Sequence, residues 1–314
     1  MSNRGRQAVS IEGGSFLMGS DEFYPEERPV HQVAVDAVRM DTYPVTVTDF
    51  RDFVEDTGWV SMAERPPDPG AYPGVDPALL VAGSLVFRRP PHRVSLRDPR
   101  VWWMYVPGAC WHRPEGPGSS IEGREDHPVT HVVYQDAEAY ARWAGADLPT
   151  EAEWEFAARG GLEGARFVWG DEAAPGGRRL ANTWHGEFPW QNIAADGFQG
   201  TSPVGAFPPN GYGLYDMAGN VWEWTADFFT SHRVDPGAKP CCIPRNPRMD
   251  DPGAAAIPSR VLKGGSHLCA PNYCLRYRPA ARSAQAVDSS ACHIGFRCVV
   301  RSGEGTTAAG KERS

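Results

Sequence analysis

The amino-acid sequence predicts a compact α+β fold with little regular secondary structure. Three observations support this fold class. The 314 residues include 34 glycines and 29 prolines, a proportion that favours turns over long helices and strands. Hydrophobic residues make up 41% of the chain and aromatic residues are plentiful, so a large core can be buried. Helical patterns can be placed in three segments, and the other ordered segments have the alternation of short strands.

The three predicted helices have recognisable boundaries. The first covers residues 46–57, where apolar side chains recur at helical spacing, and the second covers residues 136–143. The third begins at Thr150, whose hydroxyl can accept a hydrogen bond from the N3 amide while the Glu153 carboxylate reaches back to the cap. Glycines at 160–161 end this helix.

Strands are predicted where polar and apolar residues alternate. Residues 33–36 and 130–133 are two such segments. Residues 165–255 contain mostly turn-forming sequence, so little regular structure is expected there.

One folded domain is predicted, because no linker and no internal repeat interrupts the middle of the chain. We expect a flexible arm at residues 1–8, a single catalytic domain at residues 9–301 and a disordered tail at residues 302–314, which are small and polar.

Charge and hydropathy exclude several classes of partner. The net charge of −8 argues against binding to nucleic acid or to an anionic membrane surface, both of which require clustered Lys and Arg. No apolar run approaches the length of a transmembrane helix, and no apolar stretch follows the N-terminal charges. We therefore expect a cytoplasmic protein that acts as a monomer.

The cysteine content suggests metal or redox chemistry. An odd number of cysteines in a reducing compartment argues against a full disulfide framework, so some are expected to stay thiols. The seven cysteines are Cys110, Cys241, Cys242, Cys269, Cys274, Cys292 and Cys298.

Cys269 and Cys274 are the most informative of these, because a Pro-Asn turn lies between them. Two thiolates brought together by a turn form a soft donor site that suits Cu(I), zinc or an iron–sulfur cluster. Zinc and iron–sulfur sites normally need four ligands, and no second close pair supplies them, which favours Cu(I). This spacing alone is a weak signal and favours two buried thiols or one local disulfide over a metal site.

Segments along nearly the whole chain resemble the formylglycine-generating enzymes, also called sulfatase-modifying factors. The longest matching segment, Leu-Pro-Thr-Glu-Ala-Glu-Trp-Glu, covers residues 148–155, and the match also includes both cysteines of the pair. The segments that carry the resemblance are residues 14–19, 102–103, 113–117, 127–129, 148–155, 186–189, 196–200, 208–214, 219–224, 264–266, 268–269, 273–274, 276–278, 280–282, 288–290 and 295–298.

The resemblance implies an irregular fold related to C-type lectins and a specific chemistry. Enzymes of this family hold Cu(I) between two cysteines, which correspond to Cys269 and Cys274. They use O₂ to oxidise a cysteine, within a Cys-x-Pro-x-Arg segment of an unfolded sulfatase-type protein, to Cα-formylglycine. Ser266 would then be a catalytic residue near the substrate sulfur or the oxygen pocket. Coordination of the substrate thiolate would activate the substrate sulfur and fix its position at the same time.

The resemblance also implies substrate-binding residues and two structural calcium ions. Trp222, Arg276 and His293 would line the substrate groove. The first calcium ion would be held by Asn182, Thr183, Asp196 and Phe198, and the second by Asp216, Gly219, Val221 and Glu223, with Thr183, Phe198, Gly219 and Val221 contributing backbone carbonyls.

The chain departs from the family pattern at a few positions. Secreted relatives have additional disulfides, but Ala141 and Ala158 occupy two of those cysteine positions here. Cys298 is therefore expected to be a buried free thiol, as in a cytoplasmic form. His267 and residues 270–272 also differ from typical members, which leaves substrate preference open.

Two other functions on the same fold are considered. Iron-dependent sulfoxide synthases of thiol-histidine biosynthesis need a separate helical domain with histidine ligands, and this chain has neither the length nor the motif. A non-catalytic binding module would not need the Cys269 and Cys274 pair, which is intact here.

Overall fold

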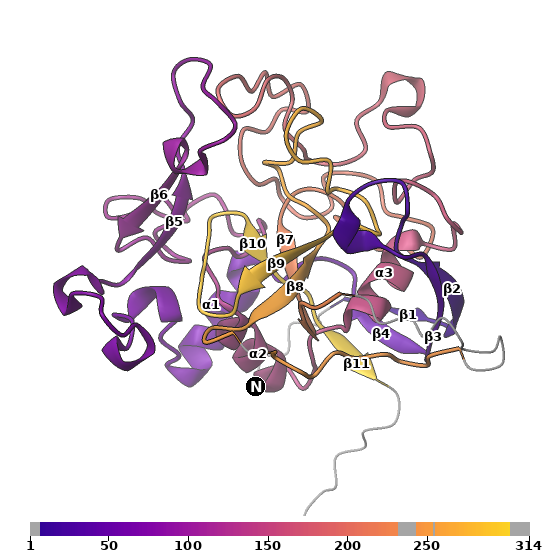
Figure 1. Ribbon diagram of the computed structural model, residues 1–314, viewed down its shortest axis with the longest axis horizontal. Coiled ribbons are helices and arrows are strands. Elements are labelled where there is room, and N and C mark those ends of the chain that lie inside the picture. Colours follow the sequence, from indigo (N-terminus) through magenta and orange to yellow (C-terminus); the bar gives the residue numbers. More distant parts are fainter. Residues whose placement is uncertain (1–6, 232–242, 254, 302–314) are drawn as a thin grey trace, which may run out of the picture.

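The computed structural model describes residues 7–231, 243–253 and 255–301, and its short elements are joined by long loops (Figure 1). This arrangement confirms the predicted α+β class with little regular structure. The described residues form the α-helices α1 (Val47–Thr57), α2 (Tyr134–Trp143) and α3 (Glu151–Arg159), the 3-10 helices η1 (Pro25–Glu27), η2 (Met62–Glu64), η3 (Pro69–Ala71), η4 (Pro77–Leu79), η5 (Pro99–Val101) and η6 (Pro175–Gly177), and the strands β1 (Ala8–Ile11), β2 (Gly14–Met18), β3 (His31–Val35), β4 (Val38–Asp41), β5 (Gly83–Phe87), β6 (Trp103–Pro107), β7 (Trp222–Phe228), β8 (Ser259–Lys263), β9 (Arg282–Ala286), β10 (Ile294–Gly295) and β11 (Val299–Arg301).

The three predicted helices are confirmed, together with the local signals that start and end them. The side chain of Thr46 accepts a hydrogen bond from the Asp49 amide at the start of α1. At the start of α3, the Thr150 amide donates to the Glu153 carboxylate at 2.7 Å, and the Glu153 amide donates to the Thr150 hydroxyl at 3.1 Å. Helix α2 begins at Tyr134, two residues before the predicted start.

The strand predictions were only partly correct. Strand β3 confirms the strand predicted at residues 33–36. The strand predicted at residues 130–133 is wrong, because this segment leads into α2 and His131 has a left-handed backbone with φ 61°. The prediction of turns for residues 165–255 missed β7, whose residues are nearly all buried, so its sequence lacks the alternation of a half-exposed strand.

Several sequence predictions fall outside the described residues. Residues 1–6 of the predicted arm and the whole predicted tail, residues 302–314, lie there, as do Cys241 and Cys242. Ala8, which was assigned to the arm, is the first residue of β1. None of the helices in the described ranges combines the length and apolar character that a bilayer span requires.

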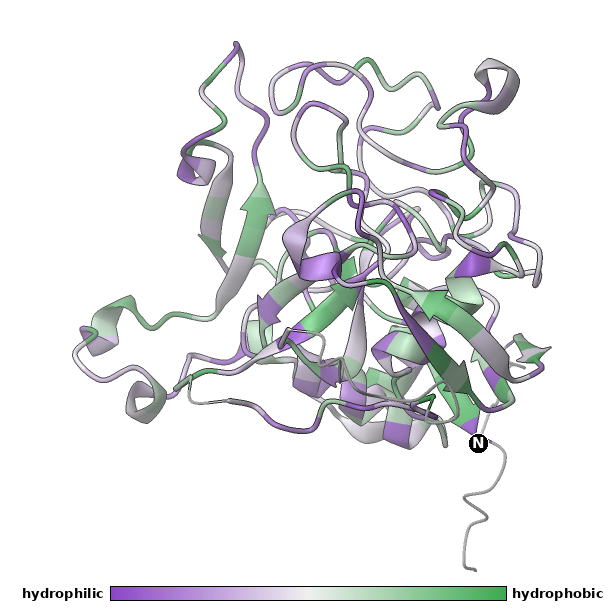
Figure 2. Ribbon diagram, turned by 45° about the vertical axis from the view of Figure 1, so that its right-hand side comes forward, coloured by the Kyte–Doolittle hydropathy of each residue, from purple (hydrophilic) through white to green (hydrophobic). Residues whose placement is uncertain are grey.

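A four-stranded sheet of order β10-β7-β8-β9 lies at the centre of the molecule (Figure 1). The β7–β10 pair is parallel and the other pairs are antiparallel. Strand β4 joins β1 to β11 in a second sheet, so the two ends of the described chain meet there. Figure 2 shows hydrophobic residues gathered in the central strands, whereas the long loops above them mix hydrophobic and hydrophilic residues.

Buried ion pairs fix α3 against the β8–β9 hairpin. The Lys263 ammonium at the end of β8 lies 2.9 Å from the Glu155 carboxylate, and neither side chain is accessible to solvent. Arg282 at the start of β9 donates to the Glu151 carboxylate at 2.7 Å. Because both acidic residues belong to α3, the ends of β8 and β9 are held at fixed positions relative to this helix.

Candidate active site

Both cysteines of the sequence-predicted pair lie in the connection between β8 and β9, residues 264–281. Lys263 and Arg282 are register partners, so this connection starts and ends at one place. Just after β8, Gly265 has φ 71°, and a Cβ atom there would lie 2.9 Å from the Arg276 carbonyl oxygen. Only glycine allows the two arms of the connection to approach this closely.

Hydrogen bonds in a tight turn bring the two sulfur atoms together. The Cys274 amide donates to the Ala270 carbonyl at 2.7 Å, and the Cys269 amide donates to the Ser266 carbonyl at 2.9 Å. The Sγ atoms of Cys269 and Cys274 are 3.2 Å apart, and both cysteines are free. A disulfide bond is about 2.05 Å long, so the structure shows two adjacent thiol groups rather than the disulfide left open by the spacing.

The two thiols differ in burial and in acidity. Cys269 is 2% exposed, and burial together with the neighbouring sulfur raises the pKa of its thiol well above the ordinary value. The pKa of Cys274 is lowered to about 7, chiefly by the hydrogen bond from Cys269 and further by the positive charge of Arg276. Of the two thiols, Cys274 is therefore the one that ionises more readily.

Arg276 reaches Cys274 because residues near the N-terminus hold its guanidinium. Its Nη1 atom lies 4.0 Å from the Cys274 sulfur, and its Nη2 atom donates to the Glu26 carboxylate at 2.6 Å. The same guanidinium lies over the Tyr24 ring, 3.8 Å from the ring centroid. The predicted substrate-binding residue Arg276 is therefore directly beside the thiol pair.

The other predicted residues of the site lie at different depths. Ser266 is fully buried next to Cys269, and its amide donates to the Cys269 sulfur at 3.4 Å. Trp222 at the start of β7 is 5% exposed and donates its amide to the His293 carbonyl at 2.8 Å. The His293 ring packs against Trp103 with ring centroids 4.8 Å apart. Trp222 and His293 thus form a separate pair beside β10 and β6, whereas Ser266 contacts Cys269.

An aromatic wall and a cavity border the turn between the cysteines. The Tyr273 ring stacks on Phe188 with centroids 4.4 Å apart, and the Asn272 side chain hydrogen-bonds the Phe188 backbone at 3.3 and 3.4 Å. Beside this contact lies a cavity of about 180 Å³ that includes Pro271 and Asn272 of the turn. Its remaining lining residues are Arg179, Thr183, Trp184, His185, Gly186, Glu187 and Tyr277.

The first predicted calcium set contains a feature that fits a cation. Oδ2 of Asp196 is buried without a hydrogen-bond partner in the described part of the chain, while Oδ1 accepts from the Phe198 amide at 3.1 Å. Asn182 is buried and its side-chain amide donates to the Gly200 carbonyl at 3.0 Å, and Thr183 lines the cavity described above. A hard cation is a suitable partner for an unsatisfied carboxylate oxygen.

The second predicted calcium set fits a cation less well. Both oxygens of Glu223 accept hydrogen bonds from Arg297, at 2.7 and 2.8 Å, so this carboxylate already has a cationic partner. Burial raises the pKa of Asp216 to about 6. Gly219 and Val221 lie in the buried backbone between these two acidic residues. A calcium ion at this set remains a prediction.

The donor set of the cysteine pair is chemically suited to Cu(I). Two adjacent sulfur atoms are soft ligands, and Cu(I) is selected by such ligands. The other described cysteines contact different groups: Cys110 lies beside His112, and the Cys292 sulfur accepts from the Phe87 amide. Cys298 is fully buried and is not in a disulfide, as predicted.

Sequence analysis missed the residues that complete the site from distant parts of the chain. Tyr24 and Glu26 position Arg276, and Phe188 packs on the turn that holds the cysteines. Residues 186–189 are one of the segments that carry the family resemblance, which could have pointed to Phe188. No local pattern marks Tyr24 or Glu26, since their partner is about 250 residues away.

Comparisons with known proteins place this geometry in a family. The family described as "Sulfatase-modifying factor enzyme 1-like domain" matches residues 1–302. The formylglycine-generating enzyme of Mycobacterium tuberculosis is 56% identical over 295 residues, covering 93% of this chain and 97% of that protein. The formylglycine-generating enzyme of Mus musculus is 45% identical, covering 92% of this chain and 74% of that protein. A protein of Bos taurus named "Inactive C-alpha-formylglycine-generating enzyme 2" is 38% identical, covering 94% and 88%.

Solved structures support the fold alone. PvdO from Pseudomonas aeruginosa superimposes with a TM-score of 0.61 at 24% identity, covering 93% of each chain. Treponema denticola variable protein 1 gives a TM-score of 0.57 at 17% identity, covering 94% of this chain and 95% of that one.

Proposed function

Because this chain belongs to the formylglycine-generating enzyme family, we propose that it converts a cysteine of a sulfatase-type protein into Cα-formylglycine. The substrate cysteine would lie in a Cys-x-Pro-x-Arg segment of an unfolded client, and O₂ would be the oxidant. The single observation that carries the proposal is the free thiol pair, with sulfur atoms 3.2 Å apart. A related protein is named inactive, so family membership alone does not decide between an enzyme and a binding protein.

Cys269 and Cys274 would hold Cu(I), which when bound supplies the one-electron chemistry with O₂. The unequal acidity of the thiols prepares the pair for a soft cation, because Cys274 is the readily ionised partner and Cys269 needs a metal to lose its proton. Arg276 stabilises the Cys274 thiolate electrostatically, and Glu26 prevents this guanidinium from turning away.

The surroundings of the pair favour access from one side. Cys269 and Ser266 are buried, whereas Cys274 is partly exposed, so a client peptide would approach from the Cys274 side. The cavity of about 180 Å³ adjoins the same turn and offers space for residues next to the client cysteine. Aromatic packing around Phe188 and Tyr273 keeps water away from the inner side of the turn.

We further propose that a calcium ion occupies the set around Asp196, where it would replace missing backbone ladders with ionic contacts. Its support is the unsatisfied, buried Oδ2 atom. A cytoplasmic location is also proposed, because the five described cysteines are not in disulfides and an oxidising compartment favours disulfides.

The direct test is to incubate the Cu(I)-loaded full chain with a Cys-x-Pro-x-Arg peptide and a thiol reductant in air. Aldehyde formation is followed by mass spectrometry of the peptide, and O₂ consumption is measured in parallel. Activity is expected to disappear in Cys269→Ala and in Cys274→Ala. It should persist in Cys298→Ala, which also removes a buried cysteine side chain but lies outside the pair. A wild-type protein with verified copper that forms no aldehyde and consumes no O₂ would contradict the proposal.

A further inference from the structure

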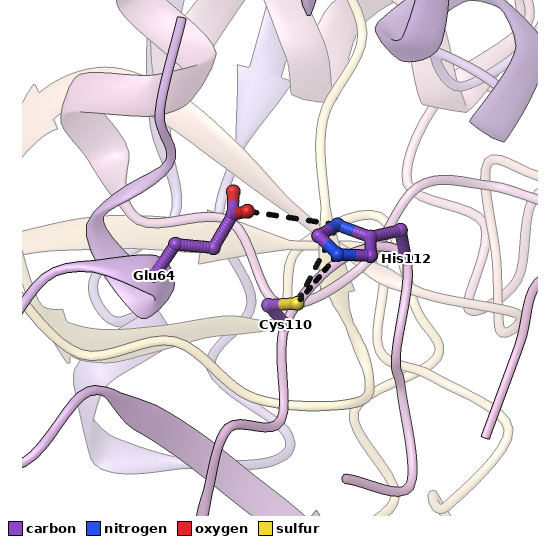
Figure 3. A group of neighbouring side chains, drawn as sticks. All are labelled: Glu64, Cys110 and His112. Carbon is purple, nitrogen blue, oxygen red and sulfur yellow. Dashed lines mark hydrogen bonds and ion pairs between the residues drawn. The ribbon is translucent and has the colours of Figure 1, made fainter. Parts of the chain in front are cut away.

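Three potential metal ligands from two separate segments meet on the side of the molecule that contains η2. Glu64 ends η2, while Cys110 and His112 lie in the loop after β6, and Figure 3 shows their side chains pointing toward one another. The Cys110 sulfur is 3.6 Å from His112 Nδ1, which is 3.7 Å from Glu64 Oε1. One ligand atom from each residue lies within 4.8 Å of the other two, and no other three His, Cys, Asp or Glu side chains in the described part of the chain lie this close together.

These distances are close to those of a tetrahedral zinc site. Zn–S bonds of about 2.3 Å and Zn–N bonds of about 2.0 Å at tetrahedral angles place sulfur and nitrogen about 3.5 Å apart. The observed separation of Cys110 Sγ and His112 Nδ1 is 3.6 Å, and Nε2 of the same ring lies 3.8 Å from the sulfur, so the ring must rotate to direct one nitrogen at an ion shared with the sulfur. Nitrogen and carboxylate oxygen in such a site are about 3.3 Å apart. The Glu64 oxygen is now 3.7 Å from Nδ1 and within 4.8 Å of the sulfur, so it must move inward to complete the set.

Hydrogen bonds hold the Glu64 side chain and the Cys110 backbone in place without a metal. Oε2 of Glu64 accepts from the Ser61 amide at 3.1 Å and from the Ser61 hydroxyl at 2.7 Å, which leaves Oε1 facing His112. The backbone of Cys110 pairs with Arg113 in both directions, at 3.2 and 3.0 Å. Hydrogen bonds that orient ligating groups in this way are typical of metal sites.

Charge and exposure define the kind of ion. A thiolate and a carboxylate together balance the charge of a divalent cation, and an imidazole adds a neutral nitrogen donor. Cys110 is 1% exposed, whereas the side chains of His112 and Glu64 are 34% and 20% exposed. Water can therefore reach a fourth coordination position from the solvent side.

We propose that Glu64, Cys110 and His112 bind a zinc ion with water as the fourth ligand, at a site separate from the Cys269 and Cys274 pair. The mixed sulfur, nitrogen and oxygen donor set suits borderline divalent cations. The ion would join η2 to the loop after β6, two segments that these side chains already bring together. This proposal does not depend on the proposed oxidase activity.

The test uses the reduced, metal-free full chain carrying Cys269→Ser and Cys274→Ser, so that the copper thiols cannot contribute. Co²⁺ is titrated as a spectroscopic probe, and Zn²⁺ is then added to displace it. We expect one equivalent of Co²⁺ to give tetrahedral visible bands and a near-ultraviolet thiolate-to-cobalt band, both removed by Zn²⁺. Adding Cys110→Ser should abolish the thiolate band, and His112→Gln should weaken binding at least about 10-fold.

Two further variants separate ligation from folding. Ser61→Ala keeps all three ligands and removes only the hydroxyl that orients Glu64, so it should weaken binding by about 10-fold. Cys298→Ser removes a buried thiol outside the cluster and should leave the titration unchanged. Circular dichroism and Tm of each metal-free variant confirm that it is folded. The proposal is overturned if no thiolate band forms, or if Cys110→Ser leaves its intensity and stoichiometry unchanged.

Discussion

Replacing Arg276 by methionine should make the Cys274 thiol less acidic, because the positive charge that stabilises its thiolate is lost. Two unit charges 4 Å apart interact by about 4 kcal/mol at an effective dielectric constant near 20 and by about 1 kcal/mol in water. The observed separation is 4.0 Å, the Arg276 side chain is 26% exposed, and Glu26 already offsets part of its charge. A value near the lower limit, about 1.4 kcal/mol, corresponds to about one pH unit.

The pH dependence of alkylation measures this change in the metal-free, reduced protein. Iodoacetamide labelling of the peptide that contains Cys274 is followed by mass spectrometry across pH, and the midpoint reports the pKa of the thiol. From a wild-type midpoint near pH 7, we expect Arg276→Met to raise the midpoint by about one pH unit. At pH 7 the thiolate fraction would then fall from about one half to about one tenth.

Arg276→Lys is the matched control, since it keeps a positive charge and loses the planar contacts with Tyr24 and Glu26. Its midpoint should lie between those of the wild type and Arg276→Met. The midpoint is the right observable because the intrinsic nucleophilicity of a thiolate rises as its pKa rises, which distorts rates at a single pH. Identical midpoints in the wild type and Arg276→Met would refute the electrostatic role.

Three other predictions concern the frame around the site. Lys263→Met removes one of the two buried cations that contact the Glu155 carboxylate, while Arg159 keeps its contact at 2.7 Å, and it should lower the free energy of unfolding in urea by about 1.5–3 kcal/mol; a loss below that of a typical surface substitution would contradict this. Burial lowers the pKa of His131 to about 3 in the folded protein. As the pH falls below about 6.5, His131 of the unfolded chain is therefore protonated before His131 of the folded protein, and the free energy of unfolding decreases. His131→Asn, which tolerates the left-handed backbone, should remove about 2 kcal/mol of the stability loss between pH 7 and pH 5; equal losses in both proteins would exclude this role. Gly265→Ala places a Cβ atom 2.9 Å from the Arg276 carbonyl oxygen and should cost at least about 2 kcal/mol in urea, and an unchanged midpoint would show that the two arms can move apart.

Local signals in the sequence were sufficient to predict the helices. The capping box of Thr150 and Glu153 is read from residues three apart, and its geometry in the structure is the one that the residue types require. The segment that contains His131 could not be predicted in the same way. Its β-branched neighbours favour a strand, but packing around the buried histidine imposes a left-handed backbone that leaves no mark in the sequence.

In the candidate site, too, some features could be predicted from the sequence and others could not. Cys269 and Cys274 could be identified from a short segment, and their proximity follows from one turn. The contact between Arg276 and Glu26 and the cluster of Glu64, Cys110 and His112 join residues far apart in the chain. Tertiary packing alone creates such contacts, so a single sequence contains no periodicity or spacing from which to infer them.

The pairing of β4 with strands from both ends of the chain affects how the protein folds during synthesis. Its partners are β1, which ends about 27 residues before it in the chain, and β11, which starts about 260 residues after it. At a synthesis rate of about 5–20 residues per second, one edge of β4 waits on the order of 10–50 s for its partner on a ribosome. During that interval the exposed edge can pair with other nascent chains. Productive expression should therefore respond to chaperones that shield nascent chains and to slower initiation, which spaces ribosomes apart.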